Sequence, residues 1–239
     1  MANRHKKVAK WCGGTFKILQ QYCVSILSYI INPFVLKDSA ATKRFFKSVY
    51  TGRLVDDLIF DGGILSYYDK ASELLDIKHF NKIVDCGCGR GGIRLFFQRI
   101  GVQYDKYIGI DFAIENTTIN ERESLISCDL SRYEFDVGND DLVVFCNSMC
   151  YLPDAELDAI IGNISCKGAS VLIVDPVPSL FWDATFNRVQ LYYRTIDEVK
   201  ELMAKNRYVQ KGISIDYLMC LRGHFIRSLS YASMFTPLM

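Results

Sequence analysis

Histidine is scarce in this chain of 239 residues, which contains only His5, His79 and His224. The nine cysteines show neither paired C-x-x-C spacing nor the short, disulfide-dense format of secreted modules. Because no His or Cys partner follows at zinc-finger distance, we expect no metal site. The cysteine pattern instead predicts a reducing, cytoplasmic setting in which most thiols serve as small core residues.

Net charge is also nearly absent, at +1, but this value hides an uneven distribution. Residues 1–50 carry nine Lys/Arg side chains and one acid, Asp38, whereas residues 51–239 carry 19 basic and 26 acidic side chains. A basic arm on an acidic body favours contact of the arm with an anionic surface and makes nucleic acid an unexpected partner. We therefore divide the chain into an N-terminal arm, residues 1–50, and one domain, residues 51–239.

Charge is missing altogether from one long stretch of the arm, the 19 residues Ile18–Leu36. Polar side chains at positions 21, 25, 28 and 32 recur at helical spacing and leave the rest of the predicted helix surface apolar. Pro33 stands where a signal peptide would need small residues, and it makes a membrane-spanning helix marginal. Two alternatives stay open: a helix lying at an anionic membrane surface, or a lid over a bound cofactor.

The densest group of glycines lies in the segment Ile83–Gly92, where a short apolar strand runs into a turn and then a helical pattern. Glycine lets the backbone turn tightly and approach a ligand, while the first N–H groups of the helix point at that ligand. The spacing of Gly87, Gly89 and Gly92 satisfies the G-x-G-x-x-G fingerprint of dinucleotide-binding proteins. Asp85 disfavours a dinucleotide, because its carboxylate would repel a pyrophosphate but would pair with a cationic amino-acid group.

The pattern Asp85-x-Gly87-x-Gly89-x-Gly91 resembles the first motif of class I S-adenosylmethionine-dependent methyltransferases, and the resemblance extends over roughly residues 65–235. It implies an α/β fold with a doubly wound, mostly parallel sheet of seven strands, helices on both faces and an antiparallel last strand. The helical arm would precede this domain. S-adenosylmethionine would bind to the main chain of the turn, which includes Cys88.

Three predicted strands bring further polar residues to the same edge of the sheet. The strand at 107–111 ends in Asp111, whose two oxygens suit both ribose hydroxyls; the alternative is a helix cap for the segment after Phe112. The strand at 124–130 carries Asp129 and Leu130, where the resembling family holds the adenine amino group. The apolar strand at 141–146 delivers Asn147 to the place where acceptor and cofactor would meet.

An aromatic residue before the first helix of the domain completes the expected cofactor site. Many small-molecule methyltransferases that the chain resembles place an aromatic there, near the methionyl carboxylate. Tyr67 and Tyr68 are the candidates, and core packing is at least an equal alternative for them. The predicted cofactor-binding residues are Tyr68, Asp85, Gly87, Cys88, Gly89, Gly91, Asp111, Phe112, Asp129, Leu130 and Asn147.

The rest of the chain continues the alternation of helices and strands. Pro153 begins a helix through Ile161, and a fifth strand follows at 169–175. The segment Thr195–Glu198 is a capping box that starts a helix to about residue 205. Strands at 209–217 and 224–231 then form a terminal hairpin, a feature that dinucleotide-binding dehydrogenases lack.

The resemblance implies transfer of a methyl group from S-adenosylmethionine to a small-molecule acceptor. His224 is the candidate general base, with Tyr151 and Tyr193 behind it, and a surface or hairpin position is the alternative for His224. The N-P-P-Y or D-P-P-Y motif of nucleic-acid amino-methylating enzymes is absent, which disfavours a nucleic-acid base as acceptor. A nicotinamide-dependent oxidoreductase and a non-catalytic, membrane-associated binding protein of the same fold remain as alternatives.

Overall fold

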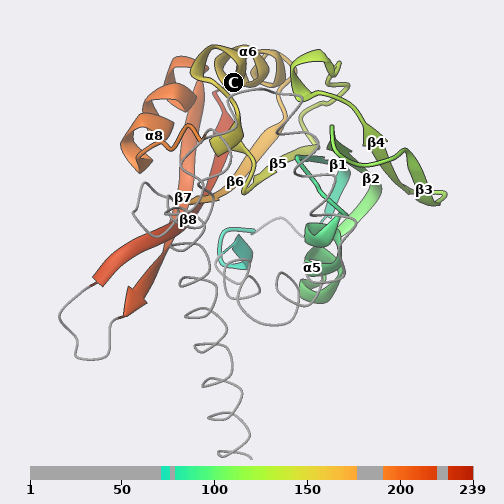
Figure 1. Cartoon of the computed structure of the whole chain (residues 1–239), viewed down its shortest axis with the longest axis horizontal. Coiled ribbons are helices and arrows are strands. Elements are labelled where there is room, and N and C mark those ends of the chain that lie inside the picture. Colours follow the sequence, from blue (N-terminus) through green and yellow to red (C-terminus); the bar gives the residue numbers. More distant parts are fainter. Residues whose placement is uncertain (1–70, 76–78, 177–190, 220–225, 239) are drawn as a thin grey trace, which may run out of the picture.

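The computed structural model describes residues 71–75, 79–176, 191–219 and 226–238 (Figure 1). The predicted arm at residues 1–50 lies outside these ranges, as do Tyr68 and His224. Within the ranges, no helix has both the length and the apolar character needed to cross a membrane.

The described residues form one eight-stranded sheet with the order β3-β4-β2-β1-β5-β6-β8-β7. Its parallel strands are β1 (His79–Cys86), β2 (Gln103–Asp111), β4 (Glu123–Ser127), β5 (Leu142–Cys146) and β6 (Ser170–Pro176). Strands that pair antiparallel are β3 (Thr117–Asn120), β7 (Tyr208–Met219) and β8 (Ile226–Pro237). Strand β1 lies between β2 and β5, so the connections leave it in opposite directions. In doubly wound sheets, ligands bind at the carboxyl ends of the strands beside this switch point.

Helices cover both faces of the sheet, as predicted. Figure 1 shows α5 (Gly92–Ile100) on one side and both α6 (Asp154–Ser165) and α8 (Ile196–Lys205) on the other. Strand β5 shows why: Leu142 and Val144 belong to the core under α5, whereas Val143 and Phe145 belong to the core under α6 and α8. A strand buried on both faces has this continuous apolar sequence.

The predicted number of strands is wrong by one, because β3 adds an eighth strand at the sheet edge. All four residues of β3 are exposed, so the segment lacks the apolar alternation from which a strand is recognised. The hairpin of β3 and β4 also replaces the helix that the alternative role of Asp111 required after Phe112.

Two strands end three or more residues away from the predicted position. Strand β4 ends at Ser127 rather than residue 130, because Asp129 caps the short 3₁₀ helix η1 (Leu130–Arg132). Strand β8 continues to Pro237 rather than ending at residue 231, and its added residues Ala232 and Phe235 are buried in the core. The capping box is confirmed, since Thr195 and Glu198 bond each other's backbone N–H groups.

Candidate functional site

The glycine turn between β1 and α5 has backbone angles that glycine adopts readily, in agreement with the tight turn that the sequence predicts. Gly87, Gly89 and Gly91 have φ angles of 73°, 53° and 76°, a region that favours glycine. The N–H groups of Gly87 and Cys88 both donate to the carbonyl of Ile110 on β2, at 2.8 and 3.1 Å. The turn is therefore fixed to the carboxyl end of the neighbouring strand, and α5 begins directly after it.

Asp111 holds the same turn from the tip of β2. Its Oδ2 accepts the N–H of Gly89 at 3.0 Å, and its Oδ1 accepts the N–H of Ala113 at 2.7 Å. These bonds fix the orientation of the carboxylate beside the turn. Phe112 follows, half-buried, in the next position.

Asp85 lies beneath the turn on the α5 side of the sheet, with 1% of its surface exposed. Its Oδ2 accepts the hydroxyl of Tyr107 at 2.5 Å, and its Oδ1 has no hydrogen-bond partner among the described residues. Burial raises the pKa of Asp85 to about 7, the Tyr107 bond lowers it, and the nearby Asp111 carboxylate raises it further. The pairing of Asp85 with a cationic ligand group stays a prediction.

The segment after β5 meets the glycine turn directly. Asn147 adopts a φ of 55°, unusual for a residue other than glycine, and its N–H donates to the carbonyl of Val174 at 2.7 Å. Ser148 is buried so close to Gly87 that a Cβ built on that glycine would lie 2.5 Å from the Ser148 Cβ. The ends of β1 and β5 therefore pack against each other, as the switch point requires.

The predicted adenine-binding residues lie on the α6 side. Asp129 is exposed and accepts the N–H and hydroxyl of Ser131 at 3.0 and 2.8 Å. Leu130 is buried and lines a groove of about 360 Å³ against Ala155 and Ile160 of α6. The structure thus gives Asp129 a capping role and leaves its predicted ligand role untested.

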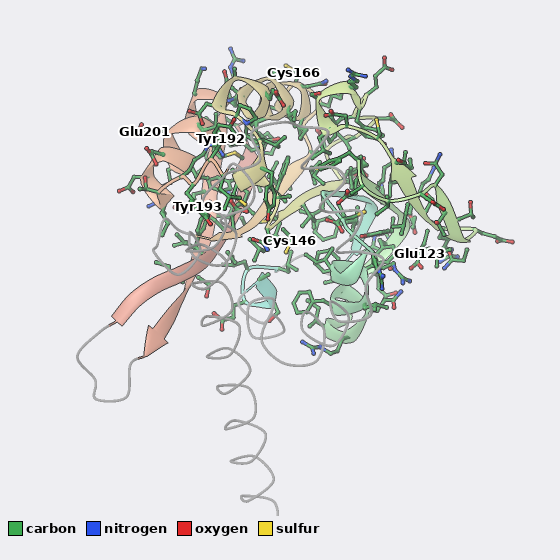
Figure 2. All side chains as sticks on the ribbon, viewed as in Figure 1. Glu123, Cys146, Cys166, Tyr192, Tyr193 and Glu201 are labelled. Carbon is green, nitrogen blue, oxygen red and sulfur yellow. The ribbon has the colours of Figure 1, made fainter. Side chains whose placement is uncertain are left out.

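Two candidate bases belong to neighbouring segments. Tyr151 ends the 3₁₀ helix η2 (Met149–Tyr151), and the residue before it, Cys150, accepts the N–H of Tyr192 at 2.7 Å. Tyr193 is the next residue, and Figure 2 shows it beside Tyr192, near α8. Both Tyr151 and Tyr193 are half-buried, and the structure brings their segments together.

Sequence reasoning missed two buried charged residues that hold η2. Asp175, at the carboxyl end of β6, lies beside the N–H groups of Ser148, Met149 and Cys150; burial raises its pKa to about 8, while the Arg194 charge and these N–H groups lower it. Arg194 donates to the carbonyls of Met149 and Leu152 at 3.0 and 2.7 Å. Asp175 had a detectable signal, a carboxylate at a strand end like Asp111, but nothing local distinguishes Arg194.

The thiols near the site are protonated core groups. Burial raises the pKa of Cys86, Cys88 and Cys150 well above the ordinary value, so none of them supplies a thiolate at neutral pH. In the described part of the chain, no group of three or more His, Cys, Asp or Glu residues is arranged to hold a metal ion.

Comparison with known proteins identifies the fold. No family model and no curated protein matches the chain. A solved S-adenosylmethionine-dependent methyltransferase from Mesorhizobium loti is 12% identical, with a TM-score of 0.55, and the match covers 72% of this chain and 99% of that one. Magnesium protoporphyrin IX methyltransferase from Synechocystis with bound SAH is 14% identical, with a TM-score of 0.57 over 83% of this chain and 100% of that one. The mitomycin 7-O-methyltransferase MmcR is 13% identical, with a TM-score of 0.55 over 94% of this chain and 68% of that one. The chain therefore has the class I methyltransferase fold.

Proposed function

We propose that this protein transfers a methyl group from S-adenosylmethionine to a small-molecule acceptor. The observation that carries the proposal is the joined geometry of the turn and Asp111: three glycines with positive φ lie beside a carboxylate fixed at the tip of the next strand. The fold supports it, since structures that match include enzymes named for a porphyrin and for mitomycin, and one holds bound SAH. The acidic body and the absence of an N-P-P-Y motif disfavour nucleic acid as the acceptor.

The residues present fit this cofactor. Its ribose hydroxyls would bind the carboxylate of Asp111, which its hydrogen bonds hold beside the turn, and its methionyl part would lie along the main chain of the turn. The buried Oδ1 of Asp85, without a partner among the described residues, lies beneath that turn. A dinucleotide fits less well, because the acidic side chain of Asp85 lies beneath the turn where its pyrophosphate would bind.

The chemistry asks little of the protein. When bound, S-adenosylmethionine supplies a methyl group that its sulfonium already activates. The chain aligns the acceptor behind that methyl group and excludes water, and a positioned base takes the acceptor's proton where one is released. We assign this base among His224, Tyr151 and Tyr193; Tyr151 lies on the turn that follows Asn147, and this position favours it.

The test is the binding of S-adenosylmethionine and its demethylated product by calorimetry, with NAD as the competing cofactor. Wild type should bind the first two and not NAD. Asp111→Ala should weaken binding by about 2–4 kcal/mol, since two charge-assisted hydrogen bonds are lost and are not fully additive. Asp105→Ala, an exposed acid on the same strand β2, is the matched control and should bind like wild type. Equal affinity in a folded Asp111 variant would refute the assignment.

Methyl-labelled cofactor with a cell extract then identifies the acceptor by mass spectrometry.

We extend the proposal to the arm, which would hold the enzyme at an anionic membrane surface on the cytoplasmic side. The support is the excess of positive charge in residues 1–50 and the apolar surface of the predicted helix at 18–36. Basic residues near anionic lipid contribute about 1 kcal/mol each, so a cluster of them with some apolar burial suffices for reversible attachment. If the arm instead covered the cofactor as a lid, the apolar surface of its helix would be buried, but its excess of positive charge would have no role.

Flotation with liposomes that contain anionic lipid separates these alternatives. The full chain should float at low salt and much less at high salt, because salt screens surface charge. Replacing Lys6, Lys7 and Lys10 with Glu should abolish flotation. Replacing Arg122, Arg132 and Lys211, which are exposed on the domain, with Glu is the matched control and should not. If wild type stays in solution at low salt, the membrane proposal fails and the lid takes its place.

A further inference from the structure

The turn η2 begins with three backbone N–H groups that its own cap residue does not satisfy. Ser148 occupies the cap position but makes no side-chain cap hydrogen bond, and its hydroxyl has no partner among the described residues. The N–H groups of Ser148, Met149 and Cys150 instead lie beside the side chain of Asp175, which belongs to β6, the strand next to β5, and they lower the pKa of its carboxyl group. A carboxyl group from a different element thus takes the place of the usual local cap.

The other end of the same turn is held by a buried cation. The guanidinium of Arg194, 8% exposed, donates to the carbonyls of Met149 and Leu152 and also bonds Asp154, the first residue of α6. The carbonyl of Cys150 accepts the N–H of Tyr192 at 2.7 Å. The carboxyl group therefore lies at the N–H end of η2 and the guanidinium at its carbonyl end, an arrangement in which both side chains stabilise the turn.

The two polar side chains are costly to bury for stability alone. Asp175 is 4% exposed, one of its oxygens has no partner in the described part of the chain, and its cross-strand neighbour Tyr231 also has a hydroxyl without a partner there. Apolar residues at such positions would give a core of equal or greater stability. What the two side chains supply is one fixed conformation for the segment that starts at Asn147, whose left-handed backbone needs support from its surroundings.

We infer that Asp175 and Arg194 are positioning residues, which act through η2 to hold Asn147 and Tyr151 where cofactor and acceptor meet. This inference rests on the proposed function, because it assigns to Asn147 a contact with the cofactor. Neither side chain touches the cofactor itself. Their role is to stop the segment after β5 from relaxing out of the geometry that the glycine turn and Ser148 require.

The experiment compares Asp175→Asn and Arg194→Lys with Glu123→Gln. Glu123 is about as buried as Asp175, at 5% exposed against 4%, but it is the first residue of β4, it bonds Arg94 of α5, and it lies across the sheet from Tyr193 (Figure 2). Three quantities are measured: the unfolding midpoint, the dissociation constant for S-adenosylmethionine, and hydrogen exchange of the peptide that spans residues 147–152. Glu123→Gln controls for the general loss of stability that any change in a buried charged network causes.

At pH 9, where the Asp175 carboxyl is ionised, Asp175→Asn should raise the dissociation constant about tenfold and speed exchange at Ser148, Met149 and Cys150, since a neutral amide is a weaker acceptor than a carboxylate. Arg194→Lys should do the same with exchange faster at Tyr151 and Leu152, because lysine keeps the charge but loses the forked geometry. Glu123→Gln should lower the unfolding midpoint and leave both the affinity and this exchange pattern unchanged.

The outcomes separate the inference from the proposed function. If the wild-type chain binds no S-adenosylmethionine, the proposed function fails and the positioning role fails with it. If wild type binds and both variants bind equally well, the positioning role alone is refuted. A loss of affinity that Glu123→Gln matches at equal stability also refutes it, because general destabilisation then accounts for the effect. Should Asp175→Asn not fold, Arg194→Lys carries the same test from the opposite end of η2.

Discussion

Two buried tyrosines on opposite faces of the sheet differ in the partner of the hydroxyl group. The hydroxyl of Tyr107 donates to Asp85 at 2.5 Å, whereas that of Tyr231 has no partner in the part of the chain that the structure describes. A buried polar group without a hydrogen bond costs about 1–3 kcal/mol, while a satisfied one contributes a modest net stabilisation. The same substitution at the two positions should therefore have opposite effects.

We predict that Tyr231→Phe raises the free energy of unfolding by about 1 kcal/mol, because it removes a buried hydroxyl that bonds nothing. Tyr107→Phe should lower it by about 1–3 kcal/mol, since Asp85 then lies buried without its donor. Urea unfolding of both variants at one pH measures the difference. A loss of stability in Tyr231→Phe would show that its hydroxyl has a partner, such as a bound water.

At the scale of elements, the junction of the glycine turn and η2 depends on the absence of one Cβ. A Cβ on Gly87 would lie 2.5 Å from that of Ser148, and the glycine's φ of 73° is strained for any other residue. Gly101, at the end of α5, has a similar φ of 78° but no atom within 4 Å of a built Cβ. The pair separates backbone strain from steric exclusion.

Gly101→Ala should cost about 1–2 kcal/mol, the price of a left-handed conformation alone. Gly87→Ala should cost more, by a further 1–3 kcal/mol or so for the forced displacement of Ser148, and should abolish cofactor binding. Thermal unfolding and calorimetry measure the two effects. If both variants lose the same stability and the Gly87 variant still binds the cofactor, the close packing of the glycine turn against η2 is needed neither for stability nor for binding.

The elements that were predicted correctly are those whose signals are local. The glycines, the apolar strands and the capping box at Thr195 each reflect a preference that a few neighbouring residues determine. Strand β3 was missed because its exposed residues carry no apolar pattern. The role of Arg194 was missed because its partners Leu152 and Asp154 are 42 and 40 positions away in sequence. Contacts of that range follow from the order of strands, which sequence periodicity does not determine.

At the scale of the whole molecule, each face of the sheet buries a carboxyl group whose pKa is raised above its ordinary value. Asp85 lies on the α5 face with a pKa of about 7, and Asp175 lies on the α6 face with a pKa of about 8; burial is the largest cause in both cases. The groups that face Asp175 from the described elements are Arg194, Cys150 on η2 and Tyr231 on β8. Both folded-state values lie above the ordinary value of 3.8.

A raised pKa of this kind determines how stability depends on pH. The folded chain binds more protons than the unfolded chain wherever the pH lies between the ordinary and the raised pKa. The stability that these carboxyls contribute in their protonated form is therefore fully present below about pH 4. It is lost as the pH rises through about 7 for Asp85 and about 8 for Asp175. Each carboxyl accounts for at most about 1.4 kcal/mol per pH unit within its window.

We therefore predict that the free energy of unfolding falls from pH 5 to pH 8 and levels off above about pH 9. Asp85→Asn and Asp175→Asn should each remove one carboxyl's share of the slope, because asparagine does not titrate. Glu123→Gln is the control. Burial raises the pKa of Glu123, but the hydrogen bonds from Tyr104 and Arg94 and the charge of Arg94 outweigh burial, so the pKa is lowered. The stability that Glu123 contributes is therefore lost only at acid pH. Urea unfolding across this range tests the prediction. A slope between pH 5 and 8 that neither asparagine variant changes would show that both buried carboxyls are ionised throughout.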